Sequence, residues 1–315
     1  MTLALVFPGQ GAQAPGMGRD LAESYPAARA AFEEVDEALG EPLSRLIWEG
    51  DAETLTLTAN AQPALMATSI AALRALEAEG VAAPRAAFLA GHSLGEYSAL
   101  CAAGALTLGD AAKLLRTRGL AMQAAVPVDE GAMAALLGLD LETARRVADE
   151  AAQGEVCAAA NDNDPAQVVV SGARAAVERA VGLAKEAGAK RAVMLPVSAP
   201  FHCALMAPAA EAMRAVLAET RVEAPRVPVV MNVTARPEAD PDAIRALLVE
   251  QVTGMVRWRE SVAFMAGEGV TEIWEVGAGR ALSGMARRID KALATRAVGT
   301  AEEARGAAAA LGGAE

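Results

Sequence analysis

Short runs of consecutive apolar residues alternate along this chain with longer stretches in which apolar and polar positions follow a helical pattern. A continuous apolar run bounded by Gly or Pro is typical of a strand covered on both faces, and the longer stretches predict helices. Outside the middle of the chain, the pattern predicts strands over residues 3–7, 86–90, 228–231 and 272–276. It predicts helices over residues 62–79, 94–103, 109–125, 204–218, 241–252 and 280–291. This alternation indicates a layered α/β fold.

The helix predicted over residues 62–79 contains a proline near its start. Pro63 would lie in the first turn, where proline is tolerated because the N–H that it lacks has no helical partner there. Gly80 follows the last helical residue, and glycine commonly ends a helix. We therefore expect this helix to begin at Gln62.

The middle of the chain has a different order of elements. Its pattern predicts strand, helix, strand, strand, helix and strand over residues 131–139, 141–152, 156–160, 167–171, 174–187 and 191–195. This β-α-β-β-α-β order is typical of a ferredoxin-like unit. Val126-Pro127 and Pro196 lie at its two ends. We therefore predict a small ferredoxin-like subdomain over residues 127–197, inserted into a larger α/β subdomain that comprises residues 1–126 and 198–315.

Composition narrows the class of protein. The chain has 315 residues, of which 53% are hydrophobic and 22% charged, and a formal net charge of -12. A nucleic-acid-binding protein needs clustered Lys and Arg, so this balance disfavours one. No stretch reaches the ~18 apolar residues of a membrane span, and the first apolar run is too short for a signal peptide. The three cysteines, which form no CxxC pair, disfavour a disulfide framework or a zinc site and fit a reducing cytoplasm: Cys101, Cys157 and Cys203.

The strongest local motif is Gly91-His92-Ser93-Leu94-Gly95, between the strand predicted over 86–90 and the helix predicted over 94–103. GxSxG in this context is a nucleophile elbow of the α/β-hydrolase type, so we predict a hydrolase-like, three-layer large subdomain. Its glycines allow a tight turn that exposes the Ser93 hydroxyl at the tip. The N–H of Leu94 lies at a helix N-terminus, where it faces an oxyanion.

A serine hydroxyl needs a base to remove its proton. The chain has two histidines, and His92 adjoins Ser93, so their side chains point to opposite sides and His92 is expected to pack beneath the elbow. His202, in a loop just before a predicted helix, is then the candidate base.

Many enzymes with this elbow place an acidic residue so that it orients the histidine. Asp162 and Asp164 are available between Ser93 and His202, but the sequence Asn-Asp-Asn-Asp-Pro around them is typical of a turn, so we interpret both as turn-forming residues. A backbone carbonyl is the alternative partner for the imidazole.

Several motifs in this order resemble the malonyl-CoA:acyl carrier protein transacylase family, which is related to the acyltransferase domains of fatty-acid and polyketide synthases. The resemblance covers nearly the whole chain and rests on Phe7-Pro8-Gly9-Gln10-Gly11, Gln62-Pro63-Ala64, Gly91-His92-Ser93-Leu94-Gly95-Glu96-Tyr97, Arg118-Gly119, Met122-Gln123, Gly131-Ala132-Met133-Ala134, Ala199-Pro200-Phe201-His202 and Glu275-Val276-Gly277.

This resemblance implies catalytic roles for five residues. Ser93 would carry the acyl group and His202 would be its base, oriented by the main-chain carbonyl of Gln251. The N–H groups of Leu94 and Gln10 would form the oxyanion hole, which suits Gln10 because glycines on both sides allow close backbone approach.

The resemblance also implies a malonyl-binding site. Arg118 would bind the free carboxylate, because a planar guanidinium meets a carboxylate through two hydrogen bonds. On helical geometry, Arg118 shares a face with Leu114 and Leu115, while Arg116 points elsewhere. Gln62 would be a further substrate-binding residue. With Phe201 before His202, the motif resembles the malonyl-selective form found in the family, since family members that use methylmalonyl tend to carry Ser at the position of Phe201.

The function implied is ping-pong transfer of malonyl from malonyl-CoA to the phosphopantetheine thiol of an acyl carrier protein, in the cytoplasm, to supply extender units for fatty-acid biosynthesis. No cofactor and no metal are expected. The alternatives are a separately encoded acyltransferase for polyketide synthesis, a serine esterase or thioesterase with water as acceptor, and an inactive binding module. Arg118 with Gln10 disfavours an esterase, and retention of Ser93 and His202 disfavours an inactive module.

An acidic carrier protein needs a local basic surface, because the chain as a whole is acidic. Two sets of basic residues are candidates, one on the small subdomain and one near the C-terminus: Lys185, Lys190 and Arg191, or Arg287, Arg288 and Lys291. Ordinary solvated helix faces are an equally good interpretation of both sets.

Overall fold

The computed structural model describes residues 2–127 and 129–312 of the chain. Its strands are β1 (Leu3–Phe7), β2 (Phe88–Gly91), β3 (Gly131–Leu137), β4 (Cys157–Asp164), β5 (Gln167–Ala173), β6 (Arg191–Met194), β7 (Val229–Val230), β8 (Pro237–Glu238), β9 (Glu272–Val276) and β10 (Ala294–Val298). Its helices are α1 (Arg19–Ser24), α2 (Pro26–Leu39), α3 (Leu43–Glu49), α4 (Ala52–Thr56), α5 (Thr58–Ala78), α6 (Gly95–Ala102), α7 (Leu108–Ala124), α8 (Leu141–Ala152), α9 (Arg174–Glu186), α10 (Ala207–Glu219), α11 (Pro241–Thr253), α12 (Trp258–Gly267), α13 (Ala281–Ile289) and α14 (Ala301–Gly312), with short 3₁₀ turns η1 (Ala83–Arg85) and η2 (Ala204–Met206).

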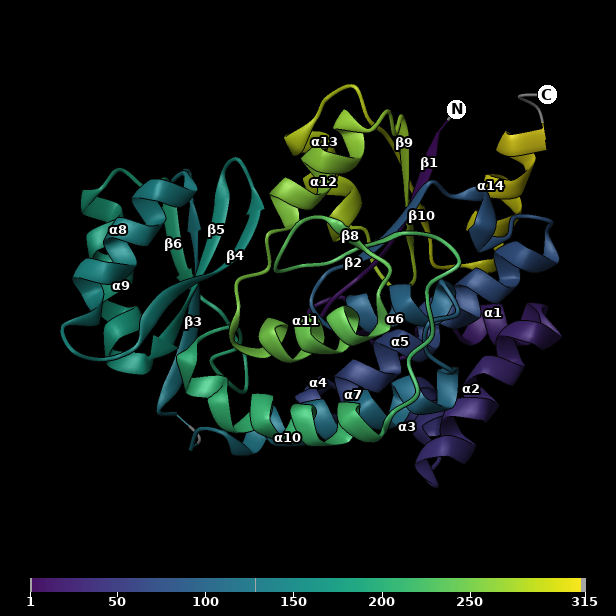
Figure 1. Cartoon of the computed structure of the whole chain (residues 1–315), viewed down its shortest axis with the longest axis horizontal. Helices are drawn as coiled ribbons and strands as arrows, with labels where there is room; N and C mark the ends of the chain where they lie inside the picture. The colour runs from purple at the N-terminus through teal and green to yellow at the C-terminus, as the bar shows by residue number, and fades with distance from the viewer. Residues whose placement is uncertain (1, 128, 313–315) are drawn as a thin grey trace.

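The larger sheet has the strand order β10-β9-β1-β2-β7-β8 and is parallel except for β8. Its central strand β1 is fully buried, and its side chains alternate between two apolar layers. Leu5 and Phe7 pack with α5 and its neighbours, whereas Ala4 and Val6 pack with α12 and α13. The ribbon shows α5 on one side of the sheet and α12 and α13 on the other (Figure 1). Helices therefore cover both faces of the sheet, which explains the continuous apolar runs and confirms the predicted α/β fold.

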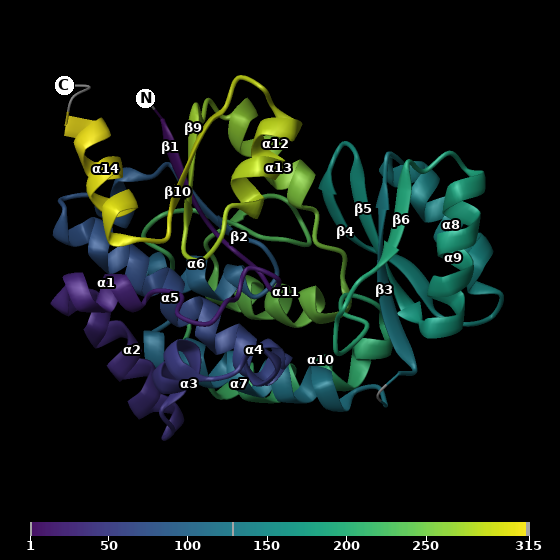
Figure 2. The ribbon, with the colours of Figure 1, turned by 180° about the vertical axis from the view of Figure 1, so that it is seen from behind.

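The second sheet has the order β4-β5-β3-β6 with antiparallel pairing throughout, as in a ferredoxin-like unit. Helices α8 and α9 cover one face of it and share a separate apolar core with β3, β4 and β5 (Figure 2). All six elements lie within residues 131–194. The subdomain limits at 127 and 197 stay a prediction.

Most predicted elements end within two residues of the observed ones, but α5 differs at its start. The helix begins at Thr58, so Pro63 lies inside it and not in its first turn. The Ala59 carbonyl, which an N–H at position 63 would otherwise bond, accepts a hydrogen bond from Arg116 Nη1 at 2.7 Å. This contact with a residue of α7 satisfies the carbonyl that the proline leaves free.

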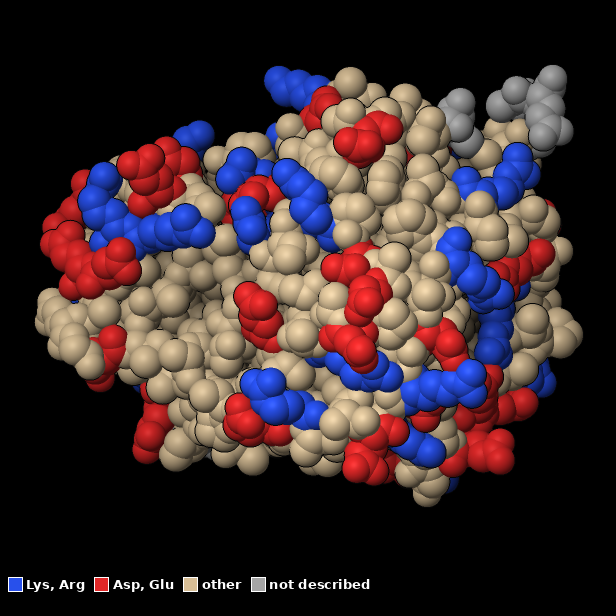
Figure 3. All heavy atoms as spheres, in the orientation of Figure 1, with Lys and Arg blue, Asp and Glu red and all other residues tan. Residues whose placement is uncertain are grey.

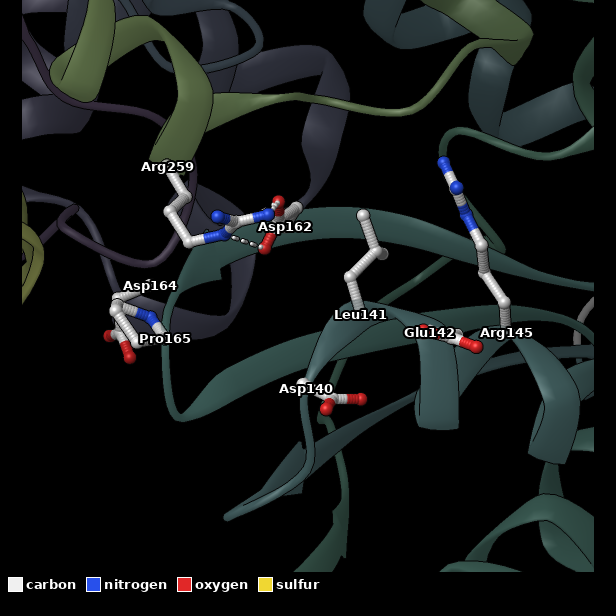
Figure 4. A pocket seen from close by; sticks show the side chains of 8 residues that line it. All are labelled: Asp140, Leu141, Glu142, Arg145, Asp162, Asp164, Pro165 and Arg259. Carbon is white, nitrogen blue, oxygen red and sulfur yellow. Dashed lines mark hydrogen bonds and ion pairs between the residues drawn. The ribbon is translucent and has the colours of Figure 1, made fainter.

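The interpretation as a turn residue is wrong for Asp162, whereas Asp164 does hold the turn between β4 and β5, because its Oδ1 accepts from the Ala166 N–H at 2.9 Å. Both belong to β4, which continues through irregular pairing to Asp164, and both are 1% exposed. Asp162 pairs with Arg259 of α12 through both carboxylate oxygens (Figure 4), and Asp164 pairs with Arg288 of α13. The strand tolerates these carboxylates because arginines distant in sequence neutralise them.

The backbone of β4 also forms an isolated bridge with a segment of the larger subdomain. Its Asp162 N–H donates to the Val256 carbonyl at 2.9 Å, and the Val256 N–H donates to the Ala160 carbonyl at 2.9 Å. Together with the ion pairs, these bonds attach the small subdomain to the segment that leads into α12. Within the part of the chain that the structure describes, no helix is long and apolar enough to cross a membrane.

The Asp162–Arg259 pair predicts unequal costs for removing its two partners. Arg259→Ala leaves a buried carboxylate without a counter-charge and should lower the free energy of unfolding by about 3 kcal/mol. Asp162→Ala should cost about 1 kcal/mol, because the Arg259 side chain is 35% exposed and water can solvate it. Urea unfolding measures both, with Arg45→Ala in the exposed Arg45–Glu49 pair as a neutral control. Equal costs would contradict this account.

Candidate active site

The turn between β2 and α6 depends on its two glycines. A Cβ on Gly91 would lie 1.9 Å from the carbonyl of Gly95, and one on Gly95 would lie 2.3 Å from the carbonyl oxygen of Phe7. Ser93, at the tip, has a φ of 52°, in the left-handed region that non-glycine residues rarely adopt. The backbone is thus held in a conformation that presents the Ser93 side chain to the cleft.

The structure brings Ser93 and His202 together. Ser93 Oγ lies 2.7 Å from His202 Nε2, although the residues are 109 positions apart. His202 Nδ1 lies 2.8 Å from the carbonyl oxygen of Gln251 and 3.1 Å from that of Gly254. Because carbonyls only accept hydrogen bonds, Nδ1 carries the proton and Nε2 presents its lone pair to the serine. Burial, followed by the charge of Arg118, lowers the pKa of His202 to about 3, so the imidazole is neutral.

Arg118 is 2% exposed and faces the same serine. Its Nη2 donates to Ser93 Oγ at 3.3 Å and to Gln251 Oε1 at 2.8 Å, and its Nη1 donates to Gln62 Oε1 at 2.7 Å. The guanidinium also lies over the Tyr97 ring, 5.8 Å from its centroid. Arg116, two residues earlier, points away and pairs with Glu41, as the helical geometry predicts.

The carboxyl group of Glu96 interacts electrostatically with Arg118. It is fully buried, and this burial raises the pKa of its carboxyl to about 8. The carboxyl is therefore mostly protonated at pH 7. The buried guanidinium consequently faces amide oxygens, a hydroxyl and an aromatic ring, with no full negative charge to balance it.

A cavity of about 350 Å³ opens onto these groups between the two subdomains. Gln10, Leu94, Gln62 and Phe201 all line it. The Gln10 turn follows β1 and lies against the elbow, since a Cβ on Gly9 would be 2.7 Å from the His92 carbonyl oxygen. Among residues 2–127 and 129–312, no acceptor bonds the N–H of Gln10 or of Leu94. Both donors are available to an oxyanion.

The side chains of Gln62 and Gln10 converge on Thr58. Gln62 Nε2 donates to Thr58 Oγ1 at 3.0 Å, and Thr58 Oγ1 donates to Gln10 Oε1 at 2.9 Å. Since Gln62 Oε1 accepts from Arg118, this chain of bonds links the Gln10 turn to the guanidinium. Gln62 therefore orients Arg118 as well as lining the cavity.

His92 lies beneath the elbow, as expected. Its Nε2 is 2.9 Å from Asn163 Oδ1 and its ring packs edge-on against Trp258, with centroids 5.7 Å apart. Burial lowers the pKa of His92. Asn163 also lines the cavity, so this bond connects the elbow to the small subdomain.

Asn232 and the side chain of Gln251 also belong to the site, although neither was predicted from the sequence. Asn232 Oδ1 accepts from the Ser93 N–H at 2.7 Å, and Gln251 Nε2 donates to the Ser93 carbonyl at 2.9 Å. Asn232 directly follows the strand predicted over 228–231, and side chains at the carboxyl ends of parallel strands commonly line sites. That position was the available signal, whereas nothing local marks the Gln251 amide.

A second cavity, of about 550 Å³, lies along β4 (Figure 4). Its lining contains no serine, cysteine or histidine and consists of Asp140, Leu141, Glu142, Arg145, Asp162, Asp164, Pro165 and Arg259. Three of its four carboxylates are already engaged, Asp162 and Asp164 in ion pairs with arginines and Asp140 in a bond from the Thr143 N–H, so we favour the Ser93 cavity as the active site.

The basic residues considered for carrier docking are exposed, but they are not equivalent. Lys185, Lys190 and Arg191 lie on the small subdomain, whereas Arg288 is already paired with Asp164. Acidic and basic side chains alternate over the face seen in Figure 3, without a broad surface of one sign.

Comparison with known proteins identifies the class to which this fold and site belong. A family model described as "Acyl transferase domain" matches residues 4–277. The chain belongs to this acyl transferase family, as the motifs predicted.

Within that family, the chain is similar to malonyl CoA-acyl carrier protein transacylases. It is 49% identical to that of Bacillus subtilis (strain 168), over 95% of this chain and 94% of the relative. It is 48% identical to that of Escherichia coli (strain K12), over 94% of this chain and 95% of the relative. The crystal structure of an acyl-carrier-protein-S-malonyltransferase from Bartonella henselae is 55% identical, with a TM-score of 0.96 over 99% of this chain and 100% of that one. A malonyl-transacylase solved in complex with a type II PKS acyl-carrier protein is 43% identical, with a TM-score of 0.96 over 98% of this chain and 100% of that one.

The glycine geometry predicts opposite effects at two positions. Gly91→Ala forces a methyl group into the Gly95 backbone and should lower the free energy of unfolding by about 1–3 kcal/mol, with loss of Ser93 reactivity. Gly182→Ala lies inside α9 with no atom within 4 Å of the added Cβ, so it should raise stability by about 0.5–1 kcal/mol. Thermal unfolding and serine labelling by a fluorophosphonate measure both effects. A Gly91→Ala protein with normal stability and labelling would refute the steric argument.

Proposed function

We propose that this chain transfers the malonyl group of malonyl-CoA to the phosphopantetheine thiol of an acyl carrier protein through a malonyl ester of Ser93. The observation that carries the proposal is the position of Ser93 Oγ, 2.7 Å from the neutral His202 Nε2 and 3.3 Å from the Arg118 guanidinium. A nucleophile between a base and a buried cation suits an acyl donor that carries its own carboxylate.

In the first half-reaction, His202 Nε2 takes the proton of Ser93 as Oγ attacks the thioester carbonyl carbon. The N–H groups of Leu94 and Gln10 donate to the oxyanion, each donor contributing about 3 kcal/mol by comparison with protease oxyanion holes. Collapse of the tetrahedral intermediate breaks the carbon–sulfur bond, and the imidazolium returns its proton to the CoA sulfur. The Gln251 carbonyl keeps the imidazole oriented throughout.

The second half-reaction reverses these steps with a different thiol. His202 takes the proton of the carrier's phosphopantetheine thiol as the sulfur attacks the ester carbonyl. The same two N–H groups hold the second oxyanion, and Ser93 Oγ leaves with the proton from the imidazolium. The enzyme is then regenerated without any cofactor.

Selectivity for malonyl follows from the unbalanced charge of Arg118. A buried cation without an anionic partner is unfavourable, and a malonyl carboxylate supplies that partner through charge-assisted hydrogen bonds. An acetyl group leaves the guanidinium unpaired and is disfavoured. Phe201, buried in the cavity wall next to His202, adds bulk beside the acyl chain.

The same charge couples substrate binding to the base. Arg118 contributes to the lowered pKa of His202 because two positive charges repel. A carboxylate paired with Arg118 offsets this repulsion and raises the basicity of the imidazole. Malonyl-CoA therefore strengthens the base that its own transfer requires.

The similar malonyl-transacylase solved with an acyl-carrier protein supports a carrier protein as the acceptor. We propose that the malonyl-carrier product supplies extender units for fatty-acid biosynthesis, with polyketide synthesis as the alternative pathway. The three free cysteines support a cytoplasmic location.

Mass spectrometry of the intact protein tests the proposed function. Incubation with malonyl-CoA should add one malonyl group to Ser93, and addition of holo acyl carrier protein should remove it as malonyl-carrier. Ser93→Ala should form no adduct, because it lacks the nucleophile. Rapid release of free malonate, in place of transfer to the carrier, would favour a thioesterase and overturn the proposal.

Arg118→Ala tests the origin of selectivity. It should lower kcat/KM for malonyl-CoA about 100-fold, as expected for truncation of one partner of a buried charge pair, and should change the acetyl-CoA value far less. Arg116→Ala removes the same charge from the other side of α7 and should preserve the malonyl-to-acetyl ratio. An unchanged ratio in Arg118→Ala would show that Arg118 does not select the substrate.

Arg118→Ala should also shift the pH profile in a defined direction. Loss of the positive charge favours the imidazolium, so the pKa of His202 rises from its value of about 3. Only the neutral imidazole accepts the serine proton. In single-turnover acylation of Ser93 by acetyl-CoA, the acid limb of the pH–rate profile should therefore move to higher pH. A profile that keeps its position or moves to lower pH would contradict the predicted coupling.

A further inference from the structure

The left-handed backbone at Ser93 needs support from its surroundings. A non-glycine residue in this region carries a cost of about 1–3 kcal/mol, which persists only when neighbouring groups hold it. The φ of 52° at Ser93 is one of five such values recorded for non-glycine residues in the described ranges. The side chain of Asn232 contacts the backbone immediately before this position, at the Ser93 N–H and at the Gly91 carbonyl.

Asn232 bonds the two peptide groups that flank His92. Its Oδ1 accepts from the Ser93 N–H at 2.7 Å, and its Nδ2 donates to the Gly91 carbonyl at 2.7 Å. Because an N–H only donates and a carbonyl only accepts, the orientation of the amide is unambiguous. Strand β7 ends at Val230, so the Asn232 side chain continues the bonding to the β2 segment beyond the end of that strand.

Two hydrogen bonds hold the main chain of Asn232 in place. Its N–H donates to Glu96 Oε2 at 2.5 Å, and its carbonyl accepts from the Arg257 N–H at 3.0 Å. Asn232 is 1% exposed, and Glu96 is fully buried on the first turn of α6. The elbow and the segment after β7 therefore hold each other through a closed set of hydrogen bonds.

We propose that Asn232 is a positioning residue for the nucleophile, which fixes the Ser93 peptide so that Oγ meets His202 and the Leu94 N–H stays free. The bond to Asn232 occupies the Ser93 N–H, which would otherwise be a competing donor to the oxyanion. Asn232 touches neither substrate nor reacting atom, and it acts through the backbone of Ser93. This inference rests on the proposed role of Ser93 as the acylated residue.

Two substitutions that keep the number and branching of the side-chain heavy atoms separate positioning from packing. Asn232→Leu keeps this branched skeleton and removes both hydrogen bonds. It should lower the single-turnover rate of acylation by malonyl-CoA about 100-fold, the effect of a small misplacement of a reacting group. The KM for malonyl-CoA should stay within about threefold, since Arg118, Gln62 and the cavity wall are unchanged.

Asn232→Asp adds a readout that depends on pH. When protonated, the new carboxyl accepts from the Ser93 N–H and donates its O–H to the Gly91 carbonyl, as the amide does. When ionised, it places negative charge against that carbonyl. Acylation by Asn232→Asp should therefore approach the wild-type rate as pH falls from 8 to 5, while Asn232→Leu stays slow throughout.

Titration of the neighbouring ionisable groups would not produce the same rise in acylation rate as the pH falls. Glu96 is mostly protonated below its pKa of about 8, and Arg257 and Arg118 keep their charge throughout the range. His202, with a pKa of about 3, stays neutral. Desolvation lowers the pKa of His92, next to Ser93, which favours its neutral form. The ratio of the Asn232→Asp rate to the wild-type rate at each pH removes any contribution that these groups make to both proteins.

A matched control removes a buried hydrogen bond outside the site. Thr68 Oγ1 donates to the Ala64 carbonyl at 3.0 Å within α5, so Thr68→Ala should lower the thermal midpoint without slowing acylation. If an Asn232 variant fails to accumulate, Asn232→Ser keeps part of the bonding and should give an intermediate rate.

The outcomes distinguish this inference from the proposed function. Wild-type rates in Asn232→Leu, or the same pH dependence in Asn232→Asp and Asn232→Leu, would overturn the positioning role. Labelling of Ser93 by a fluorophosphonate reports on the nucleophile whatever the acyl donor. If labelling falls in Asn232→Leu while the wild-type protein takes no malonyl from malonyl-CoA, the positioning role stands and the proposed function fails.

Discussion

The hydrogen bond between Ser93 and His202 is the contact on which the site depends, because each residue occupies a backbone conformation that only the surrounding fold maintains. Both have positive φ values, 52° and 58°. The groups that hold them follow the carboxyl ends of neighbouring parallel strands: the Gln10 turn after β1, the elbow after β2 and Asn232 after β7. Such ends are where α/β sheets commonly build sites, since successive loops meet at one edge. Helix α11 completes the arrangement with the Gln251 carbonyl and amide.

Burial of one cation organises the electrostatics of this site. Desolvation and the charge of Arg118 keep His202 neutral, and desolvation keeps the Glu96 carboxyl mostly protonated at pH 7. The free protein therefore presents a guanidinium held by neutral groups, with its counter-charge left to the substrate. This arrangement links recognition to chemistry, because the carboxylate that satisfies Arg118 also relieves the repulsion that weakens the base.

The second subdomain supplies the opposite wall of the cavity. Asn161, Asn163 and Gln167 line the cleft from β4 and β5, facing the elbow. Strand β4 is attached to the larger subdomain through Val256 and through the ion pairs of Asp162 and Asp164. Buried carboxylates paired across two subdomains are costly to separate, so the width of the cavity is held by the same residues that resemble a turn in sequence.

Local signals in the sequence determined the alternation of strands and helices, the GxSxG elbow and, with only two histidines in the chain, the identity of the candidate base. The apolar runs are informative because strands covered on both faces must be apolar throughout. By contrast, helices α1–α4 and α12 and strands β8 and β10 were not predicted, since their patterns are short or mixed. The position of Pro63 inside α5 and the burial and ion pairing of the β4 carboxylates were not predicted, because their partners, Arg116, Arg259 and Arg288, lie far away in the chain. Only the tertiary structure decided which amide holds the Ser93 peptide and which groups surround Arg118, because hydrogen-bond partners and burial depend on segments that meet in space without any local mark in the sequence.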